Sequence, residues 1–150
     1  MVRHGKRPAR SKAAAGNWDA RPRVLVVDDY APILGHVARL LEKEFTVAGL
    51  VLDAESLIER WTTARPDVIV LDISLPQCSG FEAAARLRKA GCDAPIVFFS
   101  VHEAPELVRA AWTAGGLGYV AKRDVGWDLV PAIRAALGGR RFVSAAIDSQ

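Results

Sequence analysis

The stretch VLVVDDY, residues 24–30, decides the fold. Its four consecutive apolar residues, Val24 to Val27, lead directly into Asp28 and Asp29. A strand that is apolar on successive residues is covered on both faces, which is typical of a parallel sheet enclosed by helices. The carboxyl ends of such strands are where open α/β sheets bind ligands. This stretch therefore predicts both a buried strand and an acidic site at its end.

The same arrangement recurs along the chain. Further short apolar runs occupy 45–51, 68–71, 96–99 and 119–121. Apolar residues recur at helical spacing within 33–41, 57–61, 81–87, 107–112 and 129–137. Five strands alternating with five helices predict an α/β fold, a doubly wound five-stranded parallel sheet of flavodoxin-like topology with strand order 2-1-3-4-5.

Residues that favour helix starts support these boundaries. Asp53 and Ser79 are suited to cap helices, and Pro32 and Pro105 are suited to first turns. Trp112 and Trp127 lie inside or at the start of predicted helices, and we expect them to pack, with an interaction face as the alternative for Trp112.

Length and composition limit the class of protein. The 150 residues, 51% of them hydrophobic, are enough for one domain with a sizeable core. No run approaches the roughly 20 apolar residues of a membrane span, and the N-terminus lacks the layout of a secretory signal. We therefore expect a cytoplasmic protein without membrane attachment. Cys78 and Cys92 have no metal-ligand spacing and are interpreted as packing residues.

The charge is divided unevenly. Residues 1–21 contain six basic side chains and one acidic side chain, a net of +5, so the rest is net −2 because the whole chain carries +3. Having no apolar periodicity, residues 1–21 are predicted to be a disordered basic extension, with an arm for an acidic partner or a transit peptide as alternatives. The domain is expected over 22–139 and a C-terminal tail over 140–150. Direct nucleic-acid binding is not expected of the slightly acidic body.

Polar side chains stand at the ends of four predicted strands: Asp28 with Asp29, then Asp72, Ser100 and Lys122. Each alone has an ordinary explanation, such as a helix cap or a surface lysine. In the predicted strand order, however, these strands are neighbours and the side chains converge. Clustered carboxylates repel unless a cation intervenes, and Mg²⁺ prefers such oxygen ligands. Because aspartate can act as a covalent nucleophile, the pattern indicates a site that accepts a phosphoryl group.

From about Arg23 to Phe142 the chain resembles the receiver domain of bacterial two-component response regulators, the CheY-like superfamily. It is most similar in character to receivers of the NarL/FixJ type. The resemblance is carried by VLVVDDY and by three further motifs, which are VIVLDISLPQCSG (68–80), IVFFSVHE (96–103) and GGLGYVAK (115–122). They cover almost the whole predicted domain in the family's order.

The resemblance implies a role for each acidic residue. Asp72 would be the phosphoacceptor. Asp29 and Asp72 would ligate Mg²⁺ directly together with the backbone carbonyl of Ser74, and Asp28 would assist through water.

It also implies roles for the residues around the acceptor. Ser100 and Lys122 would each bind an oxygen of the phosphoryl group. Tyr119 would turn inward when Ser100 is drawn toward the phosphate, so that Ser100 and Tyr119 form the switch. Ser74 and His102, each two residues beyond a key position, would tune hydrolysis of the acyl phosphate.

The function implied is that of a phosphorelay receiver. A sensor histidine kinase or phosphotransfer protein would phosphorylate Asp72, and the face made by the fourth helix, fifth strand and fifth helix would then change its binding to a downstream protein or to a second copy. Val108 and Tyr119 are candidates on that face. No turnover of an external substrate is expected, so the chain is not interpreted as an enzyme.

Two features leave alternatives open. Many receivers have proline after the lysine, whereas Arg123 follows Lys122 here. Receivers of the NarL/FixJ type usually continue into a helix-turn-helix domain, but this chain ends at Gln150. The main alternative is therefore the receiver portion of a DNA-binding transcription regulator. A third alternative, a Mg²⁺-dependent phosphatase, would need a general acid that the sequence does not show. A fourth, a receiver that works without phosphorylation, would not need the intact acidic pocket, serine and lysine.

Overall fold

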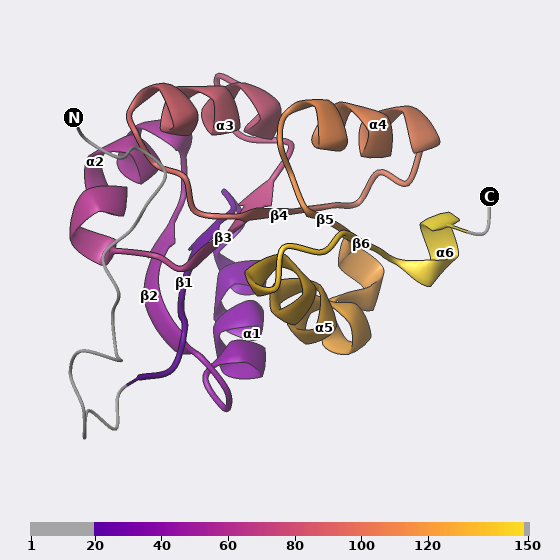
Figure 1. The fold of residues 1–150 in the computed structure, drawn as a ribbon, viewed down its shortest axis with the longest axis horizontal. Helices are drawn as coiled ribbons and strands as arrows, with labels where there is room; N and C mark the ends of the chain where they lie inside the picture. Colours follow the sequence, from indigo (N-terminus) through magenta and orange to yellow (C-terminus); the bar gives the residue numbers. More distant parts are fainter. Residues whose placement is uncertain (1–19, 149–150) are drawn as a thin grey trace.

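The computed structural model describes residues 20–148, so almost all of the predicted basic extension, residues 1–21, lies outside the described residues. In the described part, a parallel sheet is enclosed by helices on both faces (Figure 1). Its order is β2-β1-β3-β4-β5-β6. The strands are β1 (Arg23–Val27), β2 (Thr46–Val51), β3 (Val68–Asp72), β4 (Ile96–Ser100), β5 (Gly118–Ala121) and β6 (Phe142–Val143). The predicted doubly wound sheet with the order 2-1-3-4-5 is confirmed, with one short strand added.

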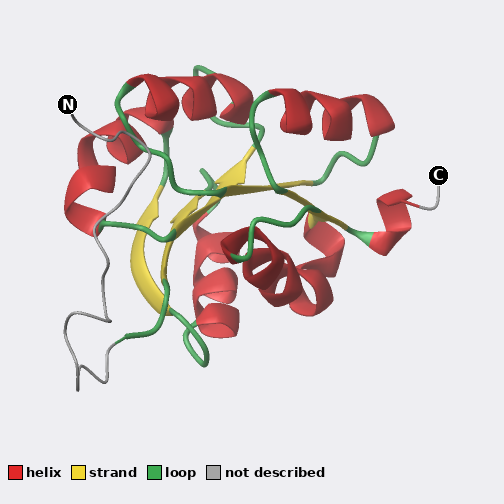
Figure 2. Cartoon of the chain, in the orientation of Figure 1, coloured by secondary structure: helices red, strands yellow, loops and turns green. Residues whose placement is uncertain are grey.

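The helices form the two outer layers (Figure 2). They are α1 (Ala31–Leu41), α2 (Ala54–Ala64), α3 (Gly80–Lys89), α4 (Pro105–Thr113), the 3₁₀ helix η1 (Lys122–Asp124), α5 (Val125–Leu137) and α6 (Ala145–Asp148). Helices α1 and α5 pack on one face, and α2, α3 and α4 pack on the other. None of the helices within residues 20–148 is both long enough and apolar enough to cross a bilayer.

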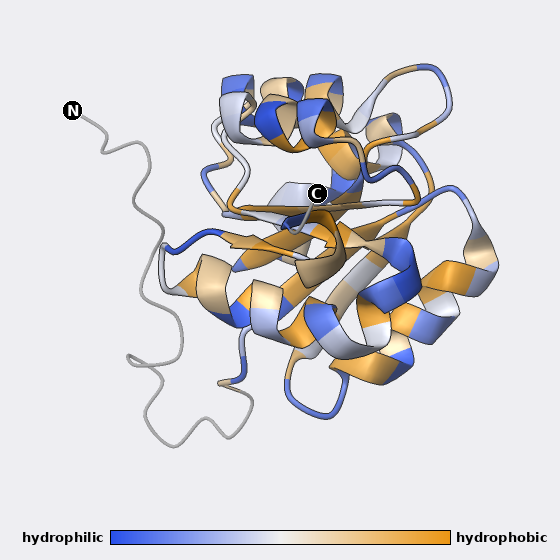
Figure 3. Ribbon diagram, turned by 90° about the vertical axis from the view of Figure 1, so that its right-hand side faces the viewer, coloured by the Kyte–Doolittle hydropathy of each residue, from blue (hydrophilic) through white to orange (hydrophobic). Residues whose placement is uncertain are grey.

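Successive residues of the central strands alternate between two hydrophobic cores. In β1, Leu25 and Val27 join the core under α2 and α3, whereas Val24 and Val26 join the core under α1 and α5, and all four are fully buried. This explains why the strand is an unbroken apolar run. Figure 3 shows the result, with mostly hydrophobic strands and helices that alternate between hydrophobic and hydrophilic stretches.

The predicted helix starts are confirmed where the chain leaves the sheet. Asp53 accepts a hydrogen bond from the Ser56 amide at 2.7 Å and caps α2. Ser79 and Glu82 form a capping box, in which each side chain accepts from the other residue's amide. A capping box satisfies two otherwise unpaired amides at the first turn. The start of α3 is thereby fixed directly beyond the loop that follows β3.

The C-terminal segment differs from the prediction of a tail. Residues 142–148 form β6 and α6 beside β5. The Ser144 amide donates to the Tyr119 carbonyl, and the Ser144 hydroxyl accepts from the Ala121 amide, both at 3.0 Å. Ser144 is fully buried and Ile147 is 4% exposed. A two-residue strand and a four-residue helix are too short to leave a periodic signal in the sequence.

We expect Ile147→Ala to lower the free energy of unfolding by about 2 kcal/mol, because it empties a buried site. Urea titration followed by circular dichroism measures this. The control Val101→Ala, at a side chain that is 67% exposed, should change it by less than about 0.5 kcal/mol. Equal stability of Ile147→Ala and the unmodified chain would show that residues 142–148 do not belong to the folded unit.

Candidate functional site

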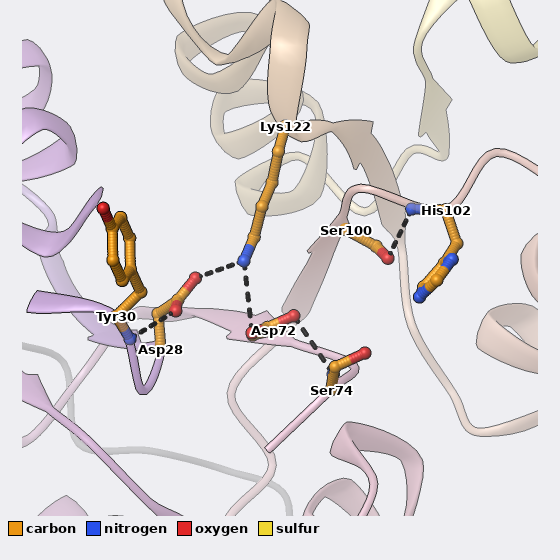
Figure 4. Close-up of polar contacts among 7 residues, drawn as sticks. All are labelled: Asp28, Tyr30, Asp72, Ser74, Ser100, His102 and Lys122. Carbon is orange, nitrogen blue, oxygen red and sulfur yellow. Dashed lines mark hydrogen bonds and ion pairs between the residues drawn. The ribbon is translucent and has the colours of Figure 1, made fainter. Parts of the chain in front are cut away.

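The polar residues predicted at the strand ends do converge at the carboxyl edge of the sheet (Figure 4). Asp28 follows β1, Asp72 ends β3, Ser100 ends β4, and Lys122 follows β5. Asp29 lies beside them, with a carboxylate oxygen in the same cluster. Because β1, β3, β4 and β5 are neighbouring parallel strands, their carboxyl ends must meet at one edge.

Lys122 holds the two buried carboxylates together. Its Nζ lies 2.6 Å from Asp28 Oδ2 and 3.2 Å from Asp72 Oδ2 (Figure 4). The lysine side chain is only 17% exposed, and Nζ lies 4.9 Å from the centre of the Phe99 ring. A cation beside two carboxylates and an aromatic face is held in position by all three.

Burial and neighbouring charges shift the pKa values of Asp72 and Lys122. Burial raises the pKa of Asp72 above its ordinary value, and the nearby Asp28 carboxylate raises it further, against the Ser74 amide and Lys122, which lower it. Burial alone would lower the pKa of Lys122, but its contacts with Asp28 and Asp72 outweigh burial and raise that pKa. The pocket therefore keeps its lysine charged while one positive group faces more than one negative group.

The loop after β3 folds back on the strand and fixes the Asp72 side chain. The Ser74 amide donates to Asp72 Oδ1 at 3.1 Å, and the Gly80 amide donates to the Ile73 carbonyl at 2.9 Å. A Cβ at Gly80 would collide with the Asp72 carbonyl and lie 2.7 Å from Ile73 Cα. Only glycine permits this close approach. Gly80, the last residue of the motif VIVLDISLPQCSG, is thus required for the geometry of the Asp72 loop.

The acidic cluster fits Mg²⁺ by its donor set. Oxygens of Asp28, Asp29 and Asp72 all lie within 4.8 Å of one another; Asp28 and Asp72 are buried, and Asp29 is exposed. Asp28 Oδ2 is buried and accepts no hydrogen bond within the described residues, although Lys122 forms an ion pair with it. Oxygen-only ligands with one solvent-facing side suit a hard cation that retains water. The Ser74 carbonyl as a ligand remains a prediction.

Ser100, His102 and Tyr119 form a hydrogen-bonded group beside the acidic pocket. The Ser100 hydroxyl, which is buried, accepts from the His102 amide at 2.9 Å. Tyr119 is fully buried, and its hydroxyl donates to the His102 carbonyl at 2.7 Å. Burial raises the pKa of the Tyr119 phenol. The backbone of the loop between β4 and α4 is therefore tied to both strands, whereas His102 itself is exposed.

One charged pair near the site was not predicted from the sequence. Arg123 forms two hydrogen bonds with Glu103, at 2.7 and 2.9 Å. The sequence singled out Arg123 only because many receivers have proline at this position. The pairing depends on how two loops approach each other. The substitution for proline was the one signal that could have pointed to it.

Several large apolar side chains are exposed. The large hydrophobic side chains exposed within residues 20–148 are Tyr30, Leu52, Val101 and Trp127. Tyr30, Leu52 and Val101 lie within three residues of the ends of β1, β2 and β4, and Trp127 lies in the first turn of α5, after β5 and η1. The expectation that Trp127 packs was wrong, since it is 83% exposed. Trp112 does pack, beneath the Arg141 guanidinium at 4.8 Å.

A doubly wound parallel sheet that places three carboxylates, a serine and a lysine at one edge defines a phosphoacceptor receiver domain. Comparison with known protein families gives the same class, since residues 24–134 match the response regulator receiver domain family. The chain belongs to this family. It is 30% identical to the response regulator UvrY of Escherichia coli (strain K12) over 129 residues, which are 85% of this chain and 59% of UvrY.

Solved structures give the same result. A LuxR-family two-component response regulator from Aurantimonas sp. SI85-9A1 is 32% identical, with a TM-score of 0.81 over 86% of this chain and 94% of that one. The signal receiver domain of the putative response regulator NarL from Mycobacterium tuberculosis is 28% identical, with a TM-score of 0.74 over 80% of this chain and 98% of that one.

We expect Asp72→Asn to raise the free energy of unfolding at pH 7.5 without Mg²⁺ by about 1 kcal/mol, because it removes a buried negative charge. A raised pKa in the folded state means that the contribution of Asp72 to stability is complete below its ordinary pKa of 3.8 and is lost as the pH rises through the raised value. The stability difference between Asp72→Asn and the unmodified chain should therefore narrow as the pH is lowered from 7.5 toward 3.8, in urea titrations with a chelator. A variant less stable than the unmodified chain at pH 7.5 would contradict this.

We expect Mg²⁺ to stabilise the chain by about 1.4 kcal/mol when its concentration is ten times the Kd. Thermal unfolding with and without Mg²⁺ measures the gain. Asp29→Asn should lose most of it, because it removes an exposed ligand with little cost to the fold. The matched control Glu59→Gln, at an exposed position on α2, should keep the full gain. An undiminished gain in Asp29→Asn would exclude this cluster as the binding site.

Proposed function

We propose that the chain is a phosphorelay receiver in which Asp72 accepts a phosphoryl group from a phosphohistidine. The observation that carries this proposal is the position of Asp72, which is buried, fixed by the Ser74 amide, and within ion-pair distance of Lys122. Asp28 and Asp29 complete the acidic cluster around it. A purely structural aspartate would not need this surplus of carboxylates.

In the proposed reaction, an Asp72 carboxylate oxygen attacks phosphorus in line. The P–N bond to the imidazole breaks, an O–P bond to Asp72 forms, and the leaving imidazole retains its electron pair. Lys122 neutralises charge on a phosphoryl oxygen, and the Ser100 hydroxyl donates to another. Asp28, Asp29 and Asp72 would hold Mg²⁺, which would supply charge neutralisation for the phosphoryl group.

The response would travel through the loop between β4 and α4. When Ser100 turns its hydroxyl to the new phosphoryl group, it alters its bond with the His102 amide, and Tyr119 is coupled to the same residue. The switched face would comprise α4, β5 and α5. Strand β6 and helix α6 adjoin this face, since the amide and the hydroxyl of Ser144, which lies between them, both form hydrogen bonds with β5. A two-state element of this kind needs only a few kcal/mol of bias.

Response regulators bind histidine kinases and downstream effectors, and we propose a cytoplasmic sensor histidine kinase or phosphotransfer protein as the donor. Any donor must bring its phosphohistidine to Asp72 and thus cover the surrounding loops. The exposed side chains of Tyr30, Val101 and Trp127 at that edge suit contact with a protein. A downstream protein or a second copy of the chain would read the switched face, and no external substrate is turned over.

Acetyl phosphate with Mg²⁺ should phosphorylate the chain, giving a retarded band on a phosphate-binding gel and a mass increase of one phosphoryl group. Asp72→Ala and a chelator should each abolish it. The control Asp53→Asn removes another carboxylate from the same edge of the sheet and should leave labelling unchanged. Labelling that survives in Asp72→Ala would move the acceptor to another residue.

A second candidate is the receiver part of a transcription regulator. The matched regions span 62% of the transcriptional regulatory protein YvfU of Bacillus subtilis (strain 168) and 60% of the transcriptional regulatory protein PdtaR of Mycobacterium tuberculosis. The observation that favours this candidate is that the named relatives extend beyond the region shared with this chain. A coding sequence that continues beyond Gln150 into a helix-turn-helix would establish it, and a stop codon there would exclude it.

A further inference from the structure

Glu103 and Arg123 form a two-pronged ion pair beside the acidic pocket. Arg123 Nε donates to Glu103 Oε2 at 2.7 Å, and Nη2 donates to Oε1 at 2.9 Å. The Glu103 side chain is 24% exposed and that of Arg123 is 61% exposed. A guanidinium that binds both oxygens of one carboxylate fixes orientation as well as distance.

The position of the pair in the chain gives it a specific effect. Glu103 lies three residues beyond Ser100, in the loop between β4 and α4, and Arg123 lies directly after Lys122, in η1. The pair therefore joins the segment that carries the serine to the segment that carries the lysine. No regular backbone pairing continues between these segments beyond Ser100 and Ala121.

The same loop has a second anchor one residue earlier. Tyr119 donates to the His102 carbonyl, while the His102 amide donates to Ser100. Tyr119 is buried in β5, so it holds the loop from inside the fold, whereas Arg123 holds it from the surface. With both anchors made, the loop cannot swing away from β5 without breaking charged and neutral hydrogen bonds together.

We propose that Glu103 and Arg123 are a positioning pair, which keeps Ser100 and Lys122 directed at Asp72 before the phosphoryl group arrives. The inference rests on the proposed function, since it concerns the speed of the same phosphorylation. The pair acts through Ser100 and Lys122, so its loss slows phosphoryl acceptance without removing the acceptor, the lysine or the acidic cluster.

The alternative is an ordinary surface ion pair, and the chain provides a matched example. Glu44 and Arg134 also join a loop to a helix, with side chains that are 44% and 55% exposed, but Glu44 lies before β2, at the opposite edge of the sheet. Exposed pairs contribute little to global stability. A rate effect confined to the pair at the site therefore separates positioning from general stabilisation.

The test compares Glu103→Gln, Arg123→Gln and the double variant with the unmodified chain in acetyl-phosphate labelling with Mg²⁺. Each single variant should be labelled about three-fold more slowly, as expected for loss of one partly exposed pair, and the double variant no more slowly than either. Exchanging the charges, Glu103→Arg with Arg123→Glu, should restore most of the rate. Glu44→Gln should have the rate of the unmodified chain.

Amide hydrogen exchange without any phosphoryl donor provides an independent measurement. The His102 amide, which donates to Ser100, should exchange about three-fold faster in both single variants than in the unmodified chain. In Glu44→Gln its exchange rate should be that of the unmodified chain. The increase in exchange rate should match the decrease in labelling rate.

Unchanged exchange at His102 in the single variants would overturn the positioning role of the pair. So would labelling of the single variants at the rate of the unmodified chain, if the unmodified chain is labelled. A parallel loss of thermal stability with no rescue by charge exchange would also overturn it, leaving a structural pair. Faster exchange at His102 in the two single variants, together with no labelling of the unmodified chain, would instead support the pair and refute the proposed function.

Discussion

One ammonium group facing two buried carboxylates organises this molecule. Lys122 follows β5, yet its charge lies between Asp28 beyond β1 and Asp72 at the end of β3. The contact therefore spans the centre of the sheet and draws three strand ends together. Charges buried to this degree persist only when they are paired. The compensation is incomplete because Asp29 adds a further carboxylate, and the residual negative charge favours a cation at this edge of the sheet.

The surrounding fold is divided into rigid and adjustable parts. Strand residues such as Val26, Ile69 and Phe98 are fully buried between two helical layers. The acidic side chains at the strand ends therefore project from a closely packed sheet. The loop from Val101 to Ala104 has no such enclosure and is fixed by a few hydrogen bonds. A phosphoryl group on Asp72, as proposed, would meet the buried strands on one side and this loop on the other, which is an arrangement suited to a switch.

The sequence predicted most of the sheet because its central strands are buried on both faces and therefore read as unbroken apolar runs. It also predicted the cluster of Asp28, Asp72 and Lys122, because topology alone brings strand ends together. It could not predict β6, which is too short for any periodicity, nor the contact of Glu103 with Arg123, which depends on the course of two loops. The exposure of Trp127 was missed because one side chain can turn outward from an otherwise regular helix start.

The short parallel strand β6 has a consequence for behaviour at high concentration. Without it, β5 would end the sheet and present a row of unpaired amides and carbonyls to other chains. With it, those groups are bonded within the chain, including through the buried Ser144 hydroxyl, and the terminal strand is only two residues long. So short a strand is a poor template for another strand. On this side the sheet is closed against aggregation by edge-to-edge pairing.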